Sequence, residues 1–149
     1  MTGLQEILGV FMDNVAATSK MVRLYIATGF LYFVVGTILL AFSLSGAVAV
    51  DRDPIFILLL YGFVTQLIFG VSYIFVPGVS RHSGANYKVI AAEYTLLNAG
   101  IIAFDGIALT GQNDAAVILG GLMAMIVAVL LHAVNIWRTI IGRKSRNAA

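Results

Sequence analysis

The chain has 149 residues, nine of them Lys or Arg and seven Asp or Glu, with a formal net charge of +2. Charged residues make up 11% and hydrophobic residues 60%, whereas about a quarter of a soluble domain is charged. The absence of cysteine excludes disulfides, thiolate metal sites and cysteine catalysis. With a mean hydropathy of +0.98, this composition predicts an integral membrane protein that does not bind nucleic acid.

The first 20 residues form a segment of mixed polarity. Its apolar residues recur at helical spacing, while Glu6, Asp13 and Asn14 fall off that stripe, which consists of Leu4, Ile7, Leu8, Phe11, Met12 and Val15. The segment is too polar to cross a bilayer, so residues 1–20 are predicted to be an amphipathic helix on the membrane surface. Docking of this helix on a partner is the alternative. Thr18 or Ser19 is expected to cap the helix that follows.

Four apolar stretches follow, at residues 22–44, 55–77, 87–109 and 115–136. The second holds no Asp, Glu, Lys, Arg or His, and as a helix it would cover roughly 34 Å, enough for a hydrocarbon layer of about 30 Å. Pro54 suits its first turn, and Pro77-Gly78 is expected to end it. The predicted fold is therefore all-α: an integral membrane four-helix bundle over residues 21–140, followed by a basic cytoplasmic tail at 141–149.

The basic residues lie almost entirely on one side of these spans. The N-terminal segment, the second loop and the tail hold all the Lys and Arg except Arg52. By the positive-inside rule both termini and the second loop are cytoplasmic, and the protein is a multi-pass protein of the cell membrane.

Small residues in the first two spans mark surfaces for helix contact. Gly62 and Gly70 lie eight residues apart on one helical face, with Gln66 midway between them. Lipid cannot satisfy the Gln66 amide, so this face is predicted to meet another helix. Gln66 and Asn98 both lie near the middle of the membrane and are predicted to join helices by hydrogen bonds. Gly29 and Gly36, one heptad apart, mark a similar face on the first span.

Glu93 and His132 lie about 8 Å from the cytoplasmic ends of the third and fourth spans, so they are at matching depth. An ionisable residue inside a span usually faces the bundle and has a partner, which predicts a Glu93–His132 pair. A stripe of small residues at intervals of four leads to His132 and is expected to be the contact face of its helix: Gly120, Ala124 and Ala128. The favoured interpretation is a pair that locks two helices together; a proton relay or ligand site is the alternative.

Asp105 lies near the outer end of the third span, at the level of Arg52 and Asp114. We expect it to be solvated or salt-bridged there, with a binding role as the alternative. The sequence contains no metal-spaced His, Cys or Glu cluster, no histidines at i and i+4, and no Gly-rich loop between a strand and a helix. We therefore predict no catalytic residues and no metal ligands.

The run GFVTQLIFGVSYIFVPG at residues 62–78 resembles the second span of small four-helix proteins related to subunit I of haem–copper oxidases and nitric oxide reductases. Segments of the other three spans are similar to the same family: LYIATGFLYFVVGTILL, AEYTLLNAGII and HAVNIWRTI. The family's haem-ligand histidines are missing, because Ile55 to Ile57 stand in the region of one and Glu93 at the other. The resemblance therefore implies a haem-protein scaffold without its cofactor, in which His132 alone remains as a haem-ligand candidate.

Three functional hypotheses follow. The first is a non-catalytic accessory subunit of a larger membrane redox complex, of the respiratory oxidase or monooxygenase type, bound to other integral membrane subunits. The second is a b-type cytochrome that uses His132 with a ligand from another copy of the chain. The third is a small proton-coupled transporter that works as a homo-oligomer through Glu93. We expect no enzymatic activity from the chain on its own.

The distribution of basic residues makes topology testable. Reporters fused to either end of the chain are expected to be active in the cytoplasm only. A C-terminal reporter that is active only outside the cell would contradict the four-span arrangement.

Overall fold

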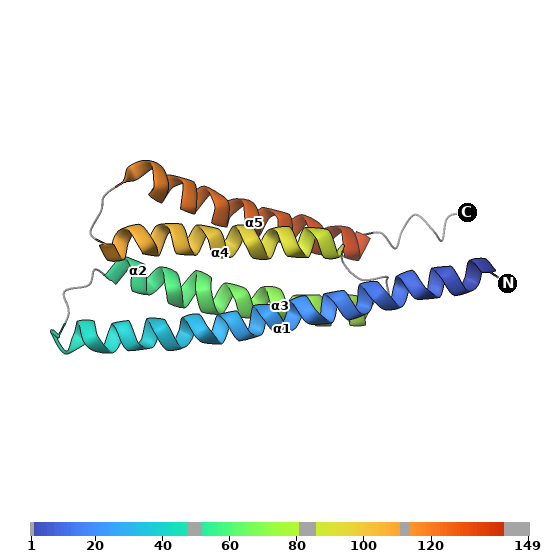
Figure 1. Ribbon diagram of the computed structural model, residues 1–149, viewed down its shortest axis with the longest axis horizontal. Helices are drawn as coiled ribbons and strands as arrows, with labels where there is room; N and C mark the ends of the chain where they lie inside the picture. Colours follow the sequence, from blue (N-terminus) through green and yellow to red (C-terminus); the bar gives the residue numbers. More distant parts are fainter. Residues whose placement is uncertain (1, 48–51, 81–85, 111–113, 142–149) are drawn as a thin grey trace.

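The computed structural model describes residues 2–47, 52–80, 86–110 and 114–141. Every regular element in those ranges is helical, which agrees with the predicted all-α class. The elements, labelled in Figure 1, are α1 (Thr2–Leu44), α2 (Arg52–Ile57), the π-helix η1 (Leu58–Thr65), α3 (Gln66–Ser80), α4 (Tyr87–Thr110) and α5 (Ala115–Ile141).

Four helical stretches of the described chain are long and apolar enough to cross a membrane, as the sequence predicted: Thr18–Leu44, Arg52–Val76, Tyr87–Thr110 and Ala115–Ile141. They lie side by side, and α1 begins at the same end of the bundle at which α5 ends (Figure 1). The second stretch is built from α2, η1 and α3, which follow one another without a break.

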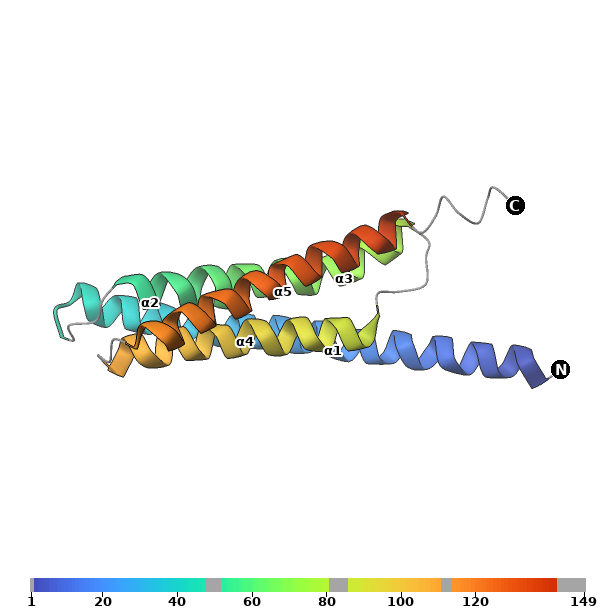
Figure 2. The same cartoon turned by 90° about the horizontal axis from the view of Figure 1, so that it is seen from above.

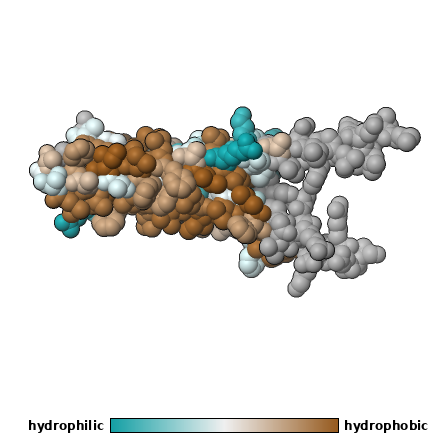
Figure 3. All heavy atoms as spheres, turned by 90° about the horizontal axis from the view of Figure 1, so that it is seen from below, coloured by the Kyte–Doolittle hydropathy of each residue, from teal (hydrophilic) through white to brown (hydrophobic). Residues whose placement is uncertain are grey.

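The outward faces of the bundle are apolar. Large hydrophobic side chains such as Phe30, Ile68, Ile102 and Leu130 are more than half exposed. Figure 3 shows hydrophobic residues covering the middle of one face, with hydrophilic residues toward the two ends of the coloured part. A surface of this kind suits contact with lipid tails or with other apolar helices.

The N-terminal segment is not a separate helix. α1 runs without interruption from Thr2 to Leu44, and its first turns extend beyond the other helices (Figure 2). The expected cap at Thr18 or Ser19 is therefore wrong, because a capping residue has to leave helical geometry. The side chains of the predicted amphipathic stripe lie outside the described residues, as do Arg81, His82 and the basic tail from residue 142 onward.

The helix ends are closed by local hydrogen bonds. α1 ends in a Schellman motif, in which Ala47 N donates to Phe42 O at 3.2 Å and Gly46 adopts a φ of 72°. Asp114 caps α5 by accepting a hydrogen bond from Ala116 N at 3.0 Å. Asn86 caps α4 in the same way through Lys88 N, also at 3.0 Å.

Two prolines bear on the second span. Pro54 lies in the first turn of α2, where its missing N–H costs no helical hydrogen bond, as expected. Pro77 does not end the helix, since α3 continues to Ser80. A proline in the last turn removes a single backbone donor, and the remaining bonds of the turn are sufficient to continue the helix.

The π-helical segment η1 lies in the half of the second span that is nearer α2. Its backbone bonds run from i to i+5, and the Thr65 hydroxyl reinforces them by donating to Leu60 O at 3.0 Å. The wider turn shifts the residues that follow around the helix axis. It therefore affects which side chains of α3 face the bundle.

Glycines bring α1 and the second span close together. A Cβ added to Gly62 would lie 2.7 Å from the Tyr32 ring, and one added to Gly70 would lie 3.1 Å from Tyr25 Cβ. In the opposite direction, a Cβ on Gly29 would meet Gln66 Cβ at 3.3 Å. The structure thus places Gly62, Gln66 and Gly70 on one face, against α1, in antiparallel order.

A second pair of glycines joins α4 and α5. A Cβ on Gly100 would lie 2.6 Å from Gly121 O, and a Cβ on Gly121 would lie 2.9 Å from Gly100 O. Gly120, which was predicted to belong to the contact face, is exposed and would meet nothing within 4 Å. Ala128 and His132 of the predicted stripe are buried as expected, together with Gly121, Met125 and Asn135.

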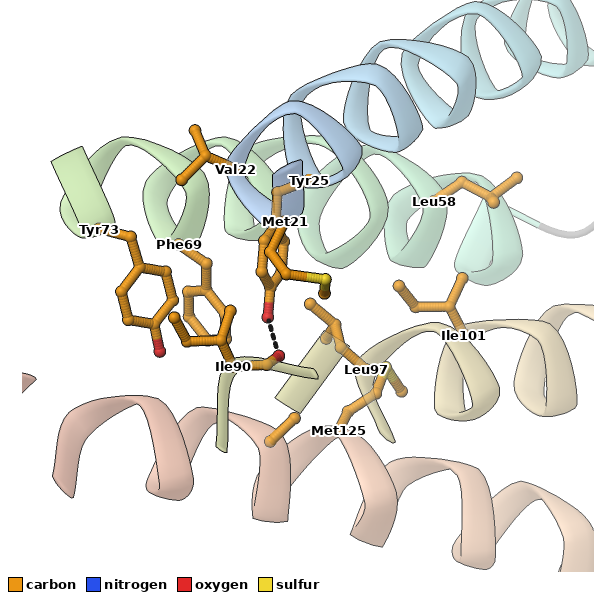
Figure 4. Close-up of a cluster of buried hydrophobic side chains, with 11 residues drawn as sticks. Met21, Val22, Tyr25, Leu58, Phe69, Tyr73, Ile90, Leu97, Ile101 and Met125 are labelled. Atoms are coloured by element: carbon orange, nitrogen blue, oxygen red, sulfur yellow. Dashed lines mark hydrogen bonds between the residues drawn. The ribbon is translucent and has the colours of Figure 1, made fainter. Parts of the chain in front are cut away.

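The apolar core lies between these close contacts. Tyr25, Ile90, Leu97 and Ile101 are fully buried, and Met125 reaches them from α5 (Figure 4). The Tyr25 hydroxyl donates to Ile90 O at 3.3 Å, so the largest ring of the core also has a polar partner.

The adjacent glycines of α5 offer a matched test of the packing. Gly121→Ala is expected to destabilise the bundle by about 1–3 kcal/mol, because its methyl group meets the α4 backbone, which cannot rotate away. Gly120→Ala is expected to be neutral or slightly stabilising, since the added methyl group has free space. Unfolding of both variants in detergent micelles measures the difference; equal stability would show that α4 and α5 do not approach at Gly121.

Candidate functional site

The Glu93 carboxylate lies fully buried between three helices near the start of α4. Its Oε2 accepts a hydrogen bond from the Tyr73 hydroxyl of α3 and lies 3.2 Å from His132 Nδ1 of α5. Its Oε1 accepts from Asn135 Nδ2 at 3.3 Å. A buried carboxylate is tolerated when donors of this kind replace its hydration, so both oxygens of Glu93 are compensated.

His132 contacts side chains of α3 and α4. Its Nε2 lies 3.0 Å from Ser72 Oγ, and its ring stacks on Phe69 with 3.7 Å between ring centroids and 7° between planes. The structure therefore brings together Glu93 and His132, the two ionisable residues that the sequence places at matching depth.

The side chains of this cluster are linked to one another by hydrogen bonds. Ser72 Oγ donates to Phe69 O at 2.8 Å, so it accepts from His132 Nε2–H. Tyr73 donates to Glu93 and accepts from Asn135 Nδ2 at 3.1 Å. His132 Nδ1 and Glu93 Oε2 complete the cluster as an ion pair or hydrogen bond at 3.2 Å. The partners of the Glu93 carboxylate therefore connect α4 to both α3 and α5.

A second polar layer joins α4 to α1 and to the second span. Asn98 Oδ1 accepts from Gln66 Nε2 and from the Tyr32 hydroxyl, each at 2.9 Å. One turn earlier on α4, the Tyr94 hydroxyl lies 2.7 Å from Thr28 Oγ1 of α1. Gln66 and Asn98 thus bond across helices, and Gln66 Oε1 has no hydrogen-bond partner among the described residues.

Asp105 is buried, whereas the sequence predicted a solvated or salt-bridged side chain. Its exposed fraction is 5%, and neither carboxylate oxygen has a hydrogen-bond partner in the described part of the chain. The expectation of a solvated or salt-bridged carboxylate is therefore wrong. Asp105 is at the predicted depth, five residues before the end of α4, but it faces inward, whereas Asp114 at the same end is exposed.

The contacts of the His132 ring bear on the prediction that it could ligate a haem iron. A haem iron needs a free ring nitrogen, but both nitrogens of His132 lie within hydrogen-bond distance of side chains, and Phe69 covers one face of the ring. Within the described residues, no three His, Cys, Asp or Glu side chains are close enough together to hold a metal ion.

Several members of the cluster were not identified from the sequence. Tyr73, Ser72 and Phe69 lie in the apolar second span, and their role depends on how that helix is rotated. Asn135 carried a usable signal, because it follows His132 by three residues and so lies on the same face of α5.

Comparison of the chain with protein-family models, with curated proteins and with solved structures finds no match. The resemblance of the second span to haem–copper oxidase relatives therefore stays a prediction.

The buried pair predicts a strong energetic coupling. Glu93→Gln or His132→Gln alone is expected to cost about 3–5 kcal/mol, because each leaves a buried charge without its partner. The double variant is expected to cost no more than either single variant, since two neutral amides need no charge compensation. Free energies of unfolding in bicelles measure this cycle, and strictly additive costs would show that the two side chains do not interact.

Proposed function

We propose that this protein is a non-catalytic accessory subunit of a membrane redox complex, of the respiratory oxidase or monooxygenase type. It crosses the cell membrane four times with both termini in the cytoplasm. The redox assignment depends on the resemblance of residues 62–78 to oxidase subunit I relatives. The accessory role is supported by the exposed small residues of α4 and by the hydrogen-bonded Glu93–His132 cluster inside the bundle.

The observation that supports a partner most directly is on the outer face of α4. Ala92, Thr95, Ala99 and Gly106 are exposed there on one side of the helix, which they share with the large side chain of Ile102. Small residues at such spacing let another helix approach its backbone closely, and close approach is a main source of helix association in lipid. The inner face of α4 carries Glu93, Leu97, Gly100 and Ile101, so the exposed small residues are not needed within the bundle.

The interior supports a structural role for the Glu93–His132 cluster. Each polar side-chain atom of Glu93 and His132 already has a partner within the bundle. A site that binds a substrate or an iron atom would need a free group at that point. The same saturation makes the b-type cytochrome hypothesis weaker than the accessory role.

Purification from native membranes in mild detergent tests the proposal. We expect the chain to co-purify in fixed ratio with a haem- or copper-containing membrane protein, identified by metal analysis and mass spectrometry. Recovery of the chain alone, or only with copies of itself, would contradict the accessory role. A Soret band in the absorption spectrum of the chain purified alone would favour the cytochrome hypothesis instead.

A matched pair of variants tests the α4 surface. Ala99→Leu is expected to reduce the co-purified partner roughly tenfold, which corresponds to about 1.4 kcal/mol, because the larger side chain prevents close approach. Ala133→Leu makes the same chemical change at an exposed position of α5 and is expected to leave the ratio unchanged. Equal loss from both variants would show that α4 does not carry the contact.

A further inference from the structure

Asp105 is the one described carboxylate that is buried and lacks any compensating group. Glu93 is equally buried but has Tyr73, His132 and Asn135 as donors, whereas both oxygens of Asp105 lack a hydrogen-bond partner in the described ranges. An isolated ionised carboxylate in an apolar environment is so unfavourable that the group takes up a proton instead.

No described group near Asp105 donates a hydrogen bond to its carboxyl oxygens. One turn away on α4, Ile101 is fully buried and apolar. Tyr32 of α1 is within electrostatic range, but its hydroxyl already donates to Asn98. The remaining titratable side chains of the described elements near this end are Arg52 and Asp53 of α2, Tyr61 of η1 and Asp114 before α5, and none of them bonds to Asp105.

We propose that Asp105 is an intramembrane proton-binding site, whose carboxyl group is protonated in the folded protein at neutral pH. This inference depends on insertion of the bundle in a membrane and not on the redox partner proposed above. Glu93 lies twelve residues earlier on the same helix, about 18 Å away along its axis. The fully buried side chains of Leu97 and Ile101 lie between the two carboxyl groups, so Asp105 binds its proton independently of the Glu93–His132 pair.

A hydrophobic carbodiimide tests this protonation state directly. A carboxylic acid adds across one C=N bond of dicyclohexylcarbodiimide: its oxygen bonds to the central carbon and its proton moves to nitrogen. The acyl group then shifts to nitrogen and leaves a stable N-acylurea, which carries the whole mass of the reagent. The reaction requires the protonated acid and no other reactant, so its extent reports the protonated fraction.

The experiment labels the full chain in native membranes over a series of pH values and locates the adduct by peptide mass spectrometry. We expect labelling at Asp105 and not at Glu93, and we expect it to fall about tenfold for each pH unit above the midpoint of titration. Asp105→Asn should lose the adduct and the infrared carbonyl band of a protonated carboxyl group. The same variant should keep the unfolding midpoint of the parent chain at neutral pH, because an amide resembles the neutral acid in size.

Three results would overturn the proposal. Labelling that does not depend on pH, or that is equal at Asp105 and Glu93, would show that protonation does not distinguish the two carboxyl groups. Protection of Asp105 by sodium ions would identify a metal-cation site instead of a proton site. If Asp105 is not labelled and Asp105→Asn removes no carbonyl band of a protonated carboxyl group, the carboxyl group is ionised in the folded protein.

Discussion

Compensation of the buried Glu93 carboxylate is the constraint on which the arrangement of three helices depends. Its donors come from α3 and α5, and they reach both oxygens from different directions. A change of one residue in the register of either helix would rotate its face by about 100° and remove a donor. Contacts between large apolar side chains are less selective, because several rotations of a helix bury similar apolar area. The polar cluster therefore specifies the relative rotation of α3, α4 and α5.

α4 forms side-chain hydrogen bonds with each of the other three spans. Near its start it bonds to α3 and α5 through Glu93, and at its middle it bonds to α1 and the second span through Tyr94 and Asn98. Glycines also allow the backbone of α4 to approach that of α5 closely, at Gly100 and Gly121. Close approach and polar bonding thus support each other: the first brings the side chains within reach, and the second selects one rotation.

The sequence predicted the four membrane-length helices and their approximate bounds, because long apolar runs are a strong signal. It did not predict that the first of them continues back to Thr2. It also placed Glu93 and His132 at one depth, since depth depends only on distance along a helix. The rotation of each helix about its own axis, which decides which residues face the neighbouring helices, was harder to predict. A stripe at intervals of four drifts by about 40° at each step, so Gly120 lies about 120° away from His132 and leaves the contact face, which Gly121 occupies instead. The inward direction of Asp105 and the donors from Tyr73 and Asn135 depend on rotation in the same way.

The two carboxyl groups of α4, Glu93 and Asp105, face different directions and therefore meet different hydrogen-bond partners. They lie twelve residues apart, which turns Asp105 about 120° away from Glu93 around the helix axis. Glu93 meets three donors and contributes to the specificity of the fold. Asp105 meets none among the described residues, so it adds no contact that an apolar side chain of similar size would not make. Packing therefore gives no physical reason for a carboxyl group at position 105, whereas the exchange of a proton requires one.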